Sequence, residues 1–287
     1  MFRPSVAASG RPAADVTAAS ERSTGDVRAL LLDALGTLVE LEPPVEPLRR
    51  ELRERFGLEV SEAQARVALR TEIAFYRAHH DEASDRERLE DLRRRATIAL
   101  RDALVTSSEG DPLAVAGGRN VGSLPLGALT EALLAALRFR PFAEVPEVLR
   151  AARERGVRLI VVSNWDVSLH DVLAETALAP LLDGVVTSAE VGSAKPDGAI
   201  FARGRELAGV AAAEVVHVGD SVEHDVAGAL AAGIEPLLVV REGQDGLGAR
   251  LRHPASEAAV PPGVRAIPTL RPLLDLLDGA GSVSFSA

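Results

Sequence analysis

The segment 27–38, Val-Arg-Ala-Leu-Leu-Leu-Asp-Ala-Leu-Gly-Thr-Leu, restricts the fold more than any other stretch of the chain. Its apolar run is typical of a buried strand, and the run ends on a carboxylate, Asp33. A glycine and a hydroxyl follow within four residues, at Gly36 and Thr37. Open α/β sheets bind ligands at the carboxyl ends of their strands, so the pattern predicts that Asp33 lies in such a site.

Further apolar segments follow the first, and helical patterns separate most of them. Strands are expected at 27–32, 157–162, 184–187, 215–218 and 236–240, with a weaker sixth at 264–267. Helices are expected at 144–155, 167–177, 197–208 and 222–232. Repeated strand–helix units predict an α/β fold, a Rossmann-like parallel sheet with helices on both faces.

A long helical region interrupts this alternation after the first strand. Segments 45–56, 61–78, 86–104 and 126–137 have the pattern of amphipathic helices, whereas 106–125 lacks periodicity and is expected to be a loop. This predicts an all-helical insert at 41–140 within an α/β core formed by 27–40 and 141–278. Residues 1–26, rich in Ala, Ser, Pro and Gly, and residues 279–287 are expected to be flexible tails.

The composition excludes several classes of function. A net charge of -10 over 287 residues disfavours nucleic acid as a partner, because phosphate backbones bind basic surfaces. The absence of cysteine excludes disulfides, thiolate catalysis and cysteine metal sites, which fits a cytoplasmic protein. No apolar run approaches the ~18 residues that a membrane span needs, so no membrane partner is expected.

Four segments with reactive or polar side chains are predicted to end at the same edge of the sheet. They contain Asp33 with Thr37, Ser163-Asn164, Lys195, and Asp220-Ser221 followed by His224-Asp225. A carboxylate can act as a nucleophile, and a serine and an asparagine can donate hydrogen bonds to anionic oxygens. A lysine can neutralise an anion, and two aspartates can hold Mg²⁺, which prefers oxygen ligands.

In this order and spacing, the segments resemble the haloacid dehalogenase-like (HAD) hydrolase superfamily. The matching motifs are Asp33-Ala-Leu-Gly-Thr-Leu38, Ser163-Asn164, Lys195-Pro196 and Gly219-Asp220-Ser221 with Asp225. The resemblance covers about 27–240 apart from the insert, whose position is similar to the branch with a helical cap between the first and second motifs. It implies hydrolysis of a small phosphorylated metabolite through an aspartyl-phosphate.

The resemblance also implies roles for single residues. Asp33 would be the covalent nucleophile, and Lys195 would hold the oxygens of the nucleophile and the substrate. Thr37, Ser163 and Asn164 would contact the transferred group.

A metal site and a strand order are implied in the same way. Mg²⁺ would lie between the Asp33 carboxylate, the backbone carbonyl of Leu35 and Asp220, with Asp225 supporting the metal shell. Counted along the chain, the strands would be ordered fifth, fourth, first, second, third, with the site beside the first.

Leu35 departs from the pattern of the phosphatases that the chain resembles. Those proteins have an aspartate two residues after the nucleophile, which protonates the leaving alcohol and later activates water. Leucine can do neither, and losing a general acid–base commonly costs ~10²–10⁴ in rate.

Three interpretations of Leu35 stay open. The first, and the favoured one, is a Mg²⁺-dependent phosphatase with reduced or specialised activity, acting on leaving groups of low pKa or aided by Glu40 or Glu42. The second is a 2-haloacid dehalogenase, in which halide leaves as a stable anion without an acid. The third is a catalytically impaired binding or regulatory protein.

Other residues receive weaker interpretations. The run Arg93-Arg94-Arg95 is expected on a solvated face of the insert, although one arginine of the insert could meet an anionic substrate. His217 lies within a predicted strand and is expected to pack in the core. Trp165 and His224 adjoin the predicted site.

Overall fold

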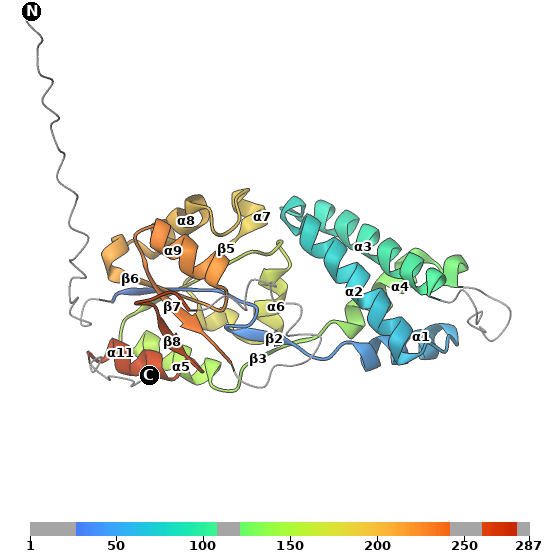
Figure 1. Ribbon diagram of the computed structural model, residues 1–287, viewed down its shortest axis with the longest axis horizontal. Coiled ribbons are helices and arrows are strands. Elements are labelled where there is room, and N and C mark those ends of the chain that lie inside the picture. The colour runs from blue at the N-terminus through green and yellow to red at the C-terminus, as the bar shows by residue number, and fades with distance from the viewer. Residues whose placement is uncertain (1–26, 108–120, 242–259, 280–287) are drawn as a thin grey trace, which may run out of the picture.

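The computed structural model describes residues 27–107, 121–241 and 260–279, which form two bodies joined by a narrow connection (Figure 1). One body contains a large sheet with its helices, and the other contains the helices of the insert. The predicted tail 1–26, nearly all of the tail 279–287 and the middle of the predicted loop 106–125 lie outside the described residues. Among the described helices, none is both long enough and apolar enough for a membrane span.

The larger body is built on a six-stranded sheet whose neighbouring strands all run parallel. The order β5-β4-β1-β6-β7-β8 places β1 in the middle, with Asp33 just after its carboxyl end. The strands are β1 (Ala29–Leu32), β4 (Arg158–Ser163), β5 (Gly184–Thr187), β6 (Val215–Gly219), β7 (Glu235–Val239) and β8 (Arg265–Ile267). The parallel α/β class and the expected order of the five main strands are confirmed, and the weaker sixth strand lies at one edge.

Both faces of the sheet are covered by helices, which explains why its strands are continuous apolar runs. Successive strand residues point to opposite faces. Leu30 and Leu32 therefore pack with α5, α6 and α11, whereas Leu31 packs with α8 and α9 on the other face (Figure 1). These helices are α5 (Val145–Glu154), α6 (Leu169–Glu175), α8 (Gly198–Ala208), α9 (Ala227–Ala231) and α11 (Pro272–Leu277).

The helix expected at 222–232 is divided in the structure. A wide π-type turn at Val222–Val226 precedes α9, and it contains the buried Asp225. Such turns are rare and occur frequently at functional sites. A further four-residue helix, α7 (Ser188–Val191), follows β5 and was not expected from the sequence.

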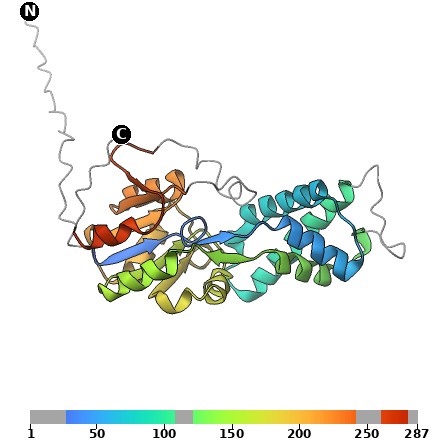
Figure 2. The same ribbon diagram turned by 90° about the horizontal axis from the view of Figure 1, so that it is seen from below.

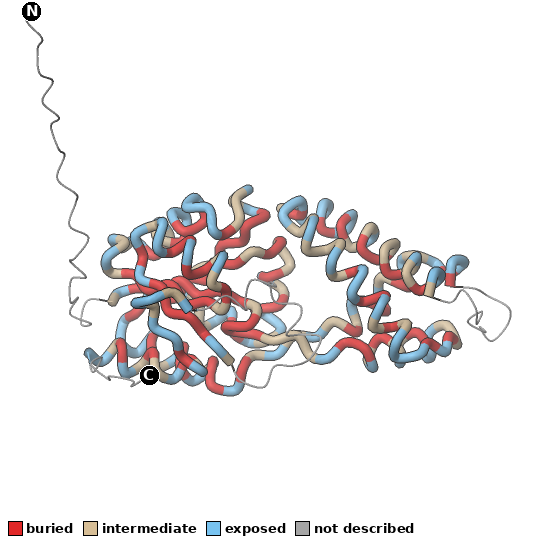
Figure 3. The backbone as a smooth tube through the Cα atoms, in the orientation of Figure 1, coloured by how far each residue is buried: buried red, intermediate tan, exposed pale blue. Residues whose placement is uncertain are grey.

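The insert, called the cap from here on, is a helical bundle with a hydrophobic core of its own. Its helices are α1 (Val45–Phe56), α2 (Glu62–His79), α3 (Arg86–Thr106) and α4 (Leu126–Ala136), each within two residues of its expected bounds. Ser61 and Gln64 form a capping box that starts α2, and Asp85 caps α3. Figure 3 shows the buried residues of these helices gathered where the helices face one another.

Two short antiparallel strands connect the cap to the core (Figure 2). They are β2 (Val39–Leu41) and β3 (Phe139–Pro141), and the predicted boundaries of the insert fall within them. Glu40 on β2 pairs with Arg140 on β3 at 3.0 Å. Strands of three residues are too short to show a period of two, so the sequence did not reveal this connection.

Candidate active site

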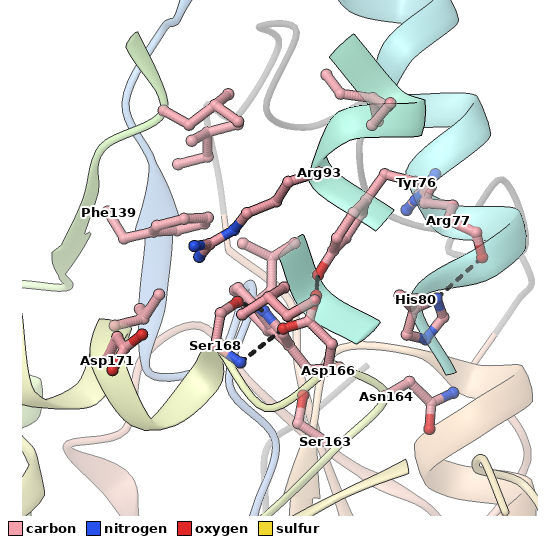
Figure 4. A pocket seen from close by; sticks show the side chains of 18 of the residues that line it. Tyr76, Arg77, His80, Arg93, Phe139, Ser163, Asn164, Asp166, Ser168 and Asp171 are labelled. Atoms are coloured by element: carbon pink, nitrogen blue, oxygen red, sulfur yellow. Dashed lines mark hydrogen bonds between the residues drawn. The ribbon is translucent and has the colours of Figure 1, made fainter. Parts of the chain in front are cut away.

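Segments that lie far apart in the sequence converge at the carboxyl edge of the sheet. Asp33 follows β1, Ser163 ends β4, Lys195 lies in the loop between α7 and α8, and Asp220 follows β6. The parallel register keeps the ends of β1, β4 and β6 level at this edge. All four side chains line one cavity of about 490 Å³, called the central cavity below, which is also lined by residues of the cap. Figure 4 shows Ser163 in this cavity together with cap residues such as Tyr76 and Arg93.

The ammonium group of Lys195 joins two buried carboxylates at the floor of this cavity. Its Nζ lies 2.6 Å from Asp33 Oδ1 and 2.6 Å from Asp225 Oδ1. Ser163 Oγ donates a further hydrogen bond to Asp33 Oδ1 at 2.9 Å, and His217 Nε2 donates to Asp225 Oδ1 at 2.8 Å. Within the described part of the chain, every hydrogen bond to the Asp33 carboxylate uses Oδ1, so Oδ2 is available for attack or for a cation.

Burial and the shared charges shift the pKa values of these groups. Burial raises the pKa of Asp33 above its ordinary value, against the opposing charge of Lys195. Burial would also raise the pKa of Asp225, but the Lys195 charge and the His217 hydrogen bond outweigh burial and lower that pKa. Burial would lower the pKa of Lys195, yet the charges of Asp225 and Asp33 raise it. Lys195 is therefore a permanent cation at the floor.

Asn164 fixes the backbone of Lys195 from two directions. Its Nδ2 donates to the Lys195 carbonyl at 3.0 Å, and its Oδ1 accepts from the Lys195 N–H at 2.7 Å. His224 Nδ1 donates to the same carbonyl at 3.0 Å. Both ends of the Asn164 amide thus hold the lysine loop. Asn164 also lines the central cavity, so its contact with the transferred group stays a prediction.

Two glycines allow the acidic side chains to approach the strand ends. Gly36 has a φ of 86°, in the left-handed region that favours glycine, and a Cβ there would overlap the Asp220 carboxylate. A Cβ on Gly219 would overlap Asp225 in the same way. Neither position can carry a side chain without moving an aspartate of the site.

The arrangement of the acidic side chains fits a divalent cation. Oxygens of Asp33, Asp220 and Asp225 all lie within 4.8 Å of one another. Three carboxylates and one ammonium leave an excess of negative charge, and oxygen-rich sites of this kind suit Mg²⁺. Because Asp225 already accepts hydrogen bonds from Lys195 and from the Ser221 N–H, the direct ligands would be Asp33 and Asp220, with Asp225 behind them.

Three residues that follow Asp33 in the sequence, Thr37, Glu40 and Glu42, do not line the central cavity. Thr37 is completely buried, its hydroxyl makes no hydrogen bond to a described residue, and it is not among the residues that line the cavity. The structure therefore does not bring this hydroxyl to the transferred group. Glu40 and Glu42 do not line the cavity either, so the structure supports neither as a replacement for the acid that is absent at Leu35. Leu35 itself lines the cavity.

An arginine that the sequence analysis did not single out braces the loop after Asp33. Arg241, after β7, donates hydrogen bonds to the carbonyls of Gly36 and Thr37 at 3.1 and 2.8 Å. It also pairs with the buried Glu144 at 2.8 Å, and its guanidinium lies 3.5 Å from the centre of the Phe142 ring. An isolated arginine after a strand carries no sequence signal for this role.

The cap contributes several polar side chains to the central cavity, which the sequence did not identify. Tyr76 Oη donates to Asp166 Oδ2 at 2.7 Å across the boundary between cap and core (Figure 4). The charge of Arg77 acts on Asp220, while burial lowers the pKa of this arginine. Glu72 is almost completely buried, and its Oε2 has no hydrogen-bond partner among the described residues. Amphipathic patterns show that a helix has a buried side, but not which part of that side borders a cavity.

We predict that Arg241→Met lowers the free energy of unfolding by about 3–5 kcal/mol, because it leaves the Glu144 carboxylate buried without its partner. Urea denaturation would measure the change. The double variant Arg241→Met with Glu144→Gln should recover much of the loss. A loss below about 1 kcal/mol in the single variant would show that the pair does not stabilise the fold.

A second prediction concerns Glu72, since burial raises the pKa of its carboxyl from 4.5 to about 8. The folded state binds this proton more tightly than the unfolded state, so stability is lost as the pH rises from about 4.5 to about 8. At 1.36 kcal/mol per pKa unit, the loss is on the order of 5 kcal/mol. Glu72→Gln, of the same shape but without a titrating group, should abolish this loss.

Urea denaturation of both proteins from pH 5 to pH 9 would test the Glu72 prediction, with the variant serving as the control for every other titrating group. The difference in stability between variant and wild type should grow with pH. A constant difference would mean that the Glu72 carboxyl titrates normally.

Comparisons with known proteins agree with this geometry. Residues 27–233 match the family model described as haloacid dehalogenase-like hydrolase. Haloacid dehalogenase-like hydrolase domain-containing protein 3 of Bos taurus is 38% identical over 136 residues, which are 47% of this chain and 51% of that protein. The phosphoserine phosphatase of Thermus thermophilus is 35% identical over 105 residues, 36% of this chain and 42% of that protein. The chain therefore spans about half the length of the curated relatives it matches.

The fold is also found among solved structures. A 2-haloacid dehalogenase from Pseudomonas syringae is similar with a TM-score of 0.56 and 21% identity, covering 88% of this chain and 98% of that chain. At that identity the likeness concerns the fold alone. With the family match over most of the core, and with the four motifs assembled at one sheet edge, the chain belongs to the haloacid dehalogenase-like hydrolases.

Proposed function

We propose that the protein is a Mg²⁺-dependent phosphatase that acts on a small phosphorylated metabolite. The observation that carries this proposal is the cluster of Asp33, Asp220 and Asp225 around one lysine. Displacement of a halide needs no metal ion, whereas a phosphoryl group brings negative charge that a metal and a lysine offset. A relative that is named as a phosphoserine phosphatase supports the same class of reaction.

In the first step, Asp33 Oδ2 attacks phosphorus, a new P–O bond forms, and the bond to the substrate oxygen breaks. Ser163 and Lys195 orient the nucleophile through Oδ1, which leaves the other oxygen to react. Mg²⁺, when bound, offsets the charge on the phosphoryl oxygens. The product is an aspartyl-phosphate on Asp33.

In the second step, water attacks phosphorus, the P–O bond to Asp33 breaks, and inorganic phosphate leaves with the carboxylate restored. Leu35 carries no proton, so the leaving oxygen takes its proton from solvent and the attacking water gives one to solvent. The first step is therefore fast only when the leaving group is stable as an anion. Acyl phosphates and phenolic phosphates meet this condition, and alkyl phosphates do not.

Leu35 also favours a second candidate, a protein that binds a phosphorylated ligand without turning it over. The carboxylates, Lys195 and the cavity would then serve binding alone. A broad panel of phosphate esters separates the two candidates, because the binding protein would give no product while Mg²⁺ still raised its melting temperature. Halide release from 2-haloacids in EDTA would instead support a dehalogenase.

We predict that wild-type protein hydrolyses nitrophenyl phosphate with Mg²⁺, that EDTA abolishes this activity, and that Asp33→Asn lowers it by ~10³-fold or more, because the amide is not a nucleophile. Asp91→Asn, which alters a surface aspartate of the cap, is the control and should keep the activity. Equal rates for wild type and Asp33→Asn would refute the proposed nucleophile.

A gain of function is expected at position 35. Leu35→Asp should raise kcat for an alkyl phosphate by ~10²-fold or more, because it supplies the absent acid, while nitrophenyl phosphate should change little. Leu35→Asn has almost the same shape as the aspartate and carries no proton to transfer, so it should give no gain. If both variants accelerate alkyl phosphates equally, polarity at this position matters and proton transfer does not.

A further inference from the structure

Three consecutive arginines on α3 have different surroundings. Successive residues of an α-helix point about 100° apart, so the three side chains cannot share one face. Arg94 is exposed and pairs with Asp91 at 2.7 Å, whereas Arg95 is half-buried and pairs with Glu82 at 2.6 Å. Arg93 instead lines the central cavity.

The guanidinium of Arg93 extends into the cavity from the cap side. Figure 4 shows it between Phe139 and Tyr76, directed away from its own helix. The residue is half-buried, yet its side chain makes neither a hydrogen bond nor an ion pair with any residue in the described ranges. A guanidinium has five N–H donors, and partial burial makes their desolvation costly unless an anion binds them.

Two acidic side chains that line the cavity with Arg93, Asp166 and Asp171, are engaged elsewhere. Asp166 accepts from Tyr76 Oη through Oδ2 and from the Ser168 N–H through Oδ1. Both oxygens of Asp171 accept from Arg86, at 2.8 and 3.4 Å. The charge of Arg93 acts on the pKa values of Asp171 and Tyr76 only from a distance. The arginine therefore has its donors available for a ligand.

Arg93 is also distinct from the cations at the floor of the cavity. The groups that act on Asp33 are Lys195, Asp225 and Ser163, and the cap arginine whose charge acts on Asp220 is Arg77. The walls of the same cavity include the apolar side chains of Leu137, Phe139, Trp165 and Val172. These walls would suit the carbon skeleton of a substrate, with an anionic group at each end.

We propose that Arg93 binds a second anionic group of the substrate, a carboxylate or a phosphate, so that the preferred substrates are phosphomonoesters carrying another acid. The inference rests on the proposed function for the identity of the first group. A guanidinium binds both kinds of anion through two parallel hydrogen bonds, which fixes the orientation of the ligand as well as its affinity. Arg93 would thus determine which substrates bind well, while Asp33 and Lys195 at the floor of the cavity take part in the reaction.

The test compares wild type, Arg93→Gln and the matched control Arg94→Gln on three phenolic phosphates, whose leaving groups need no acid. These are 4-carboxyphenyl phosphate, 1,4-phenylene bisphosphate and 4-methylphenyl phosphate, of which only the first two carry a second anion. Arg93→Gln should lower kcat/KM at least about tenfold for one or both of the substrates with a second anion. Its kcat/KM for 4-methylphenyl phosphate should change less than about twofold, and Arg94→Gln should leave all three unchanged. Comparing the loss for 4-carboxyphenyl phosphate with the loss for 1,4-phenylene bisphosphate shows whether the second group is a carboxylate or a phosphate.

Equal losses on all three substrates would overturn the proposal, because Arg93 would then act on the transferred phosphate or on the fold. Absence of any loss would overturn it as well. If wild type hydrolyses none of the three esters, the proposed phosphatase function is refuted. The role of Arg93 is then tested by measuring the binding of phosphonates, which cannot be hydrolysed. Calorimetry with 4-carboxybenzylphosphonate and 4-methylbenzylphosphonate should then show a preference for the first ligand that Arg93→Gln removes, and no preference in wild type would refute the role of Arg93.

Discussion

One buried ammonium group holds the active edge of this sheet together. Lys195 lies at hydrogen-bond distance from Asp33, just after β1, and from Asp225, in the π-type turn that follows β6. These two carboxylates would repel each other without a cation between them. The lysine is itself held through its backbone by Asn164, at the end of a third strand. A single contact therefore requires β1, β4 and β6 to be in register, so the stability of the fold and the chemistry of the site share the same interactions.

The same contact explains why the site remains electronegative. Lys195 offsets one of the three clustered carboxylates, and the remaining negative charge suits a divalent cation. The same cavity is also lined by apolar side chains such as Leu137 and Trp165 and by polar side chains of the cap such as Tyr76 and Arg93. In the proposed function, the core supplies the groups that bind the phosphate, and the cap supplies groups that contact the rest of the substrate.

The sequence could predict the parts of this molecule that depend on local pattern. Strand-terminal residues such as Asp33 and Asp220 were assigned to one edge because parallel topology brings the carboxyl ends of strands together. Residues whose role depends on how the helices pack could not be identified from the sequence. Glu72 and Arg93 look like ordinary charges on amphipathic helices until the rotation of α2 and α3 is known, and Arg241 acts through backbone carbonyls that no motif records.

Arg241 also bears on how the chain reaches its native state. The loop after Asp33 is synthesised before most of the described residues, yet the guanidinium that donates hydrogen bonds to its carbonyls is synthesised some two hundred residues later. Until then the Gly36–Thr37 turn lacks its brace, and Glu144 lacks its counter-ion. A nascent chain can thus form its first strand–helix units before these contacts exist, and the loop after Asp33 gains them only once β7 and Arg241 have been synthesised.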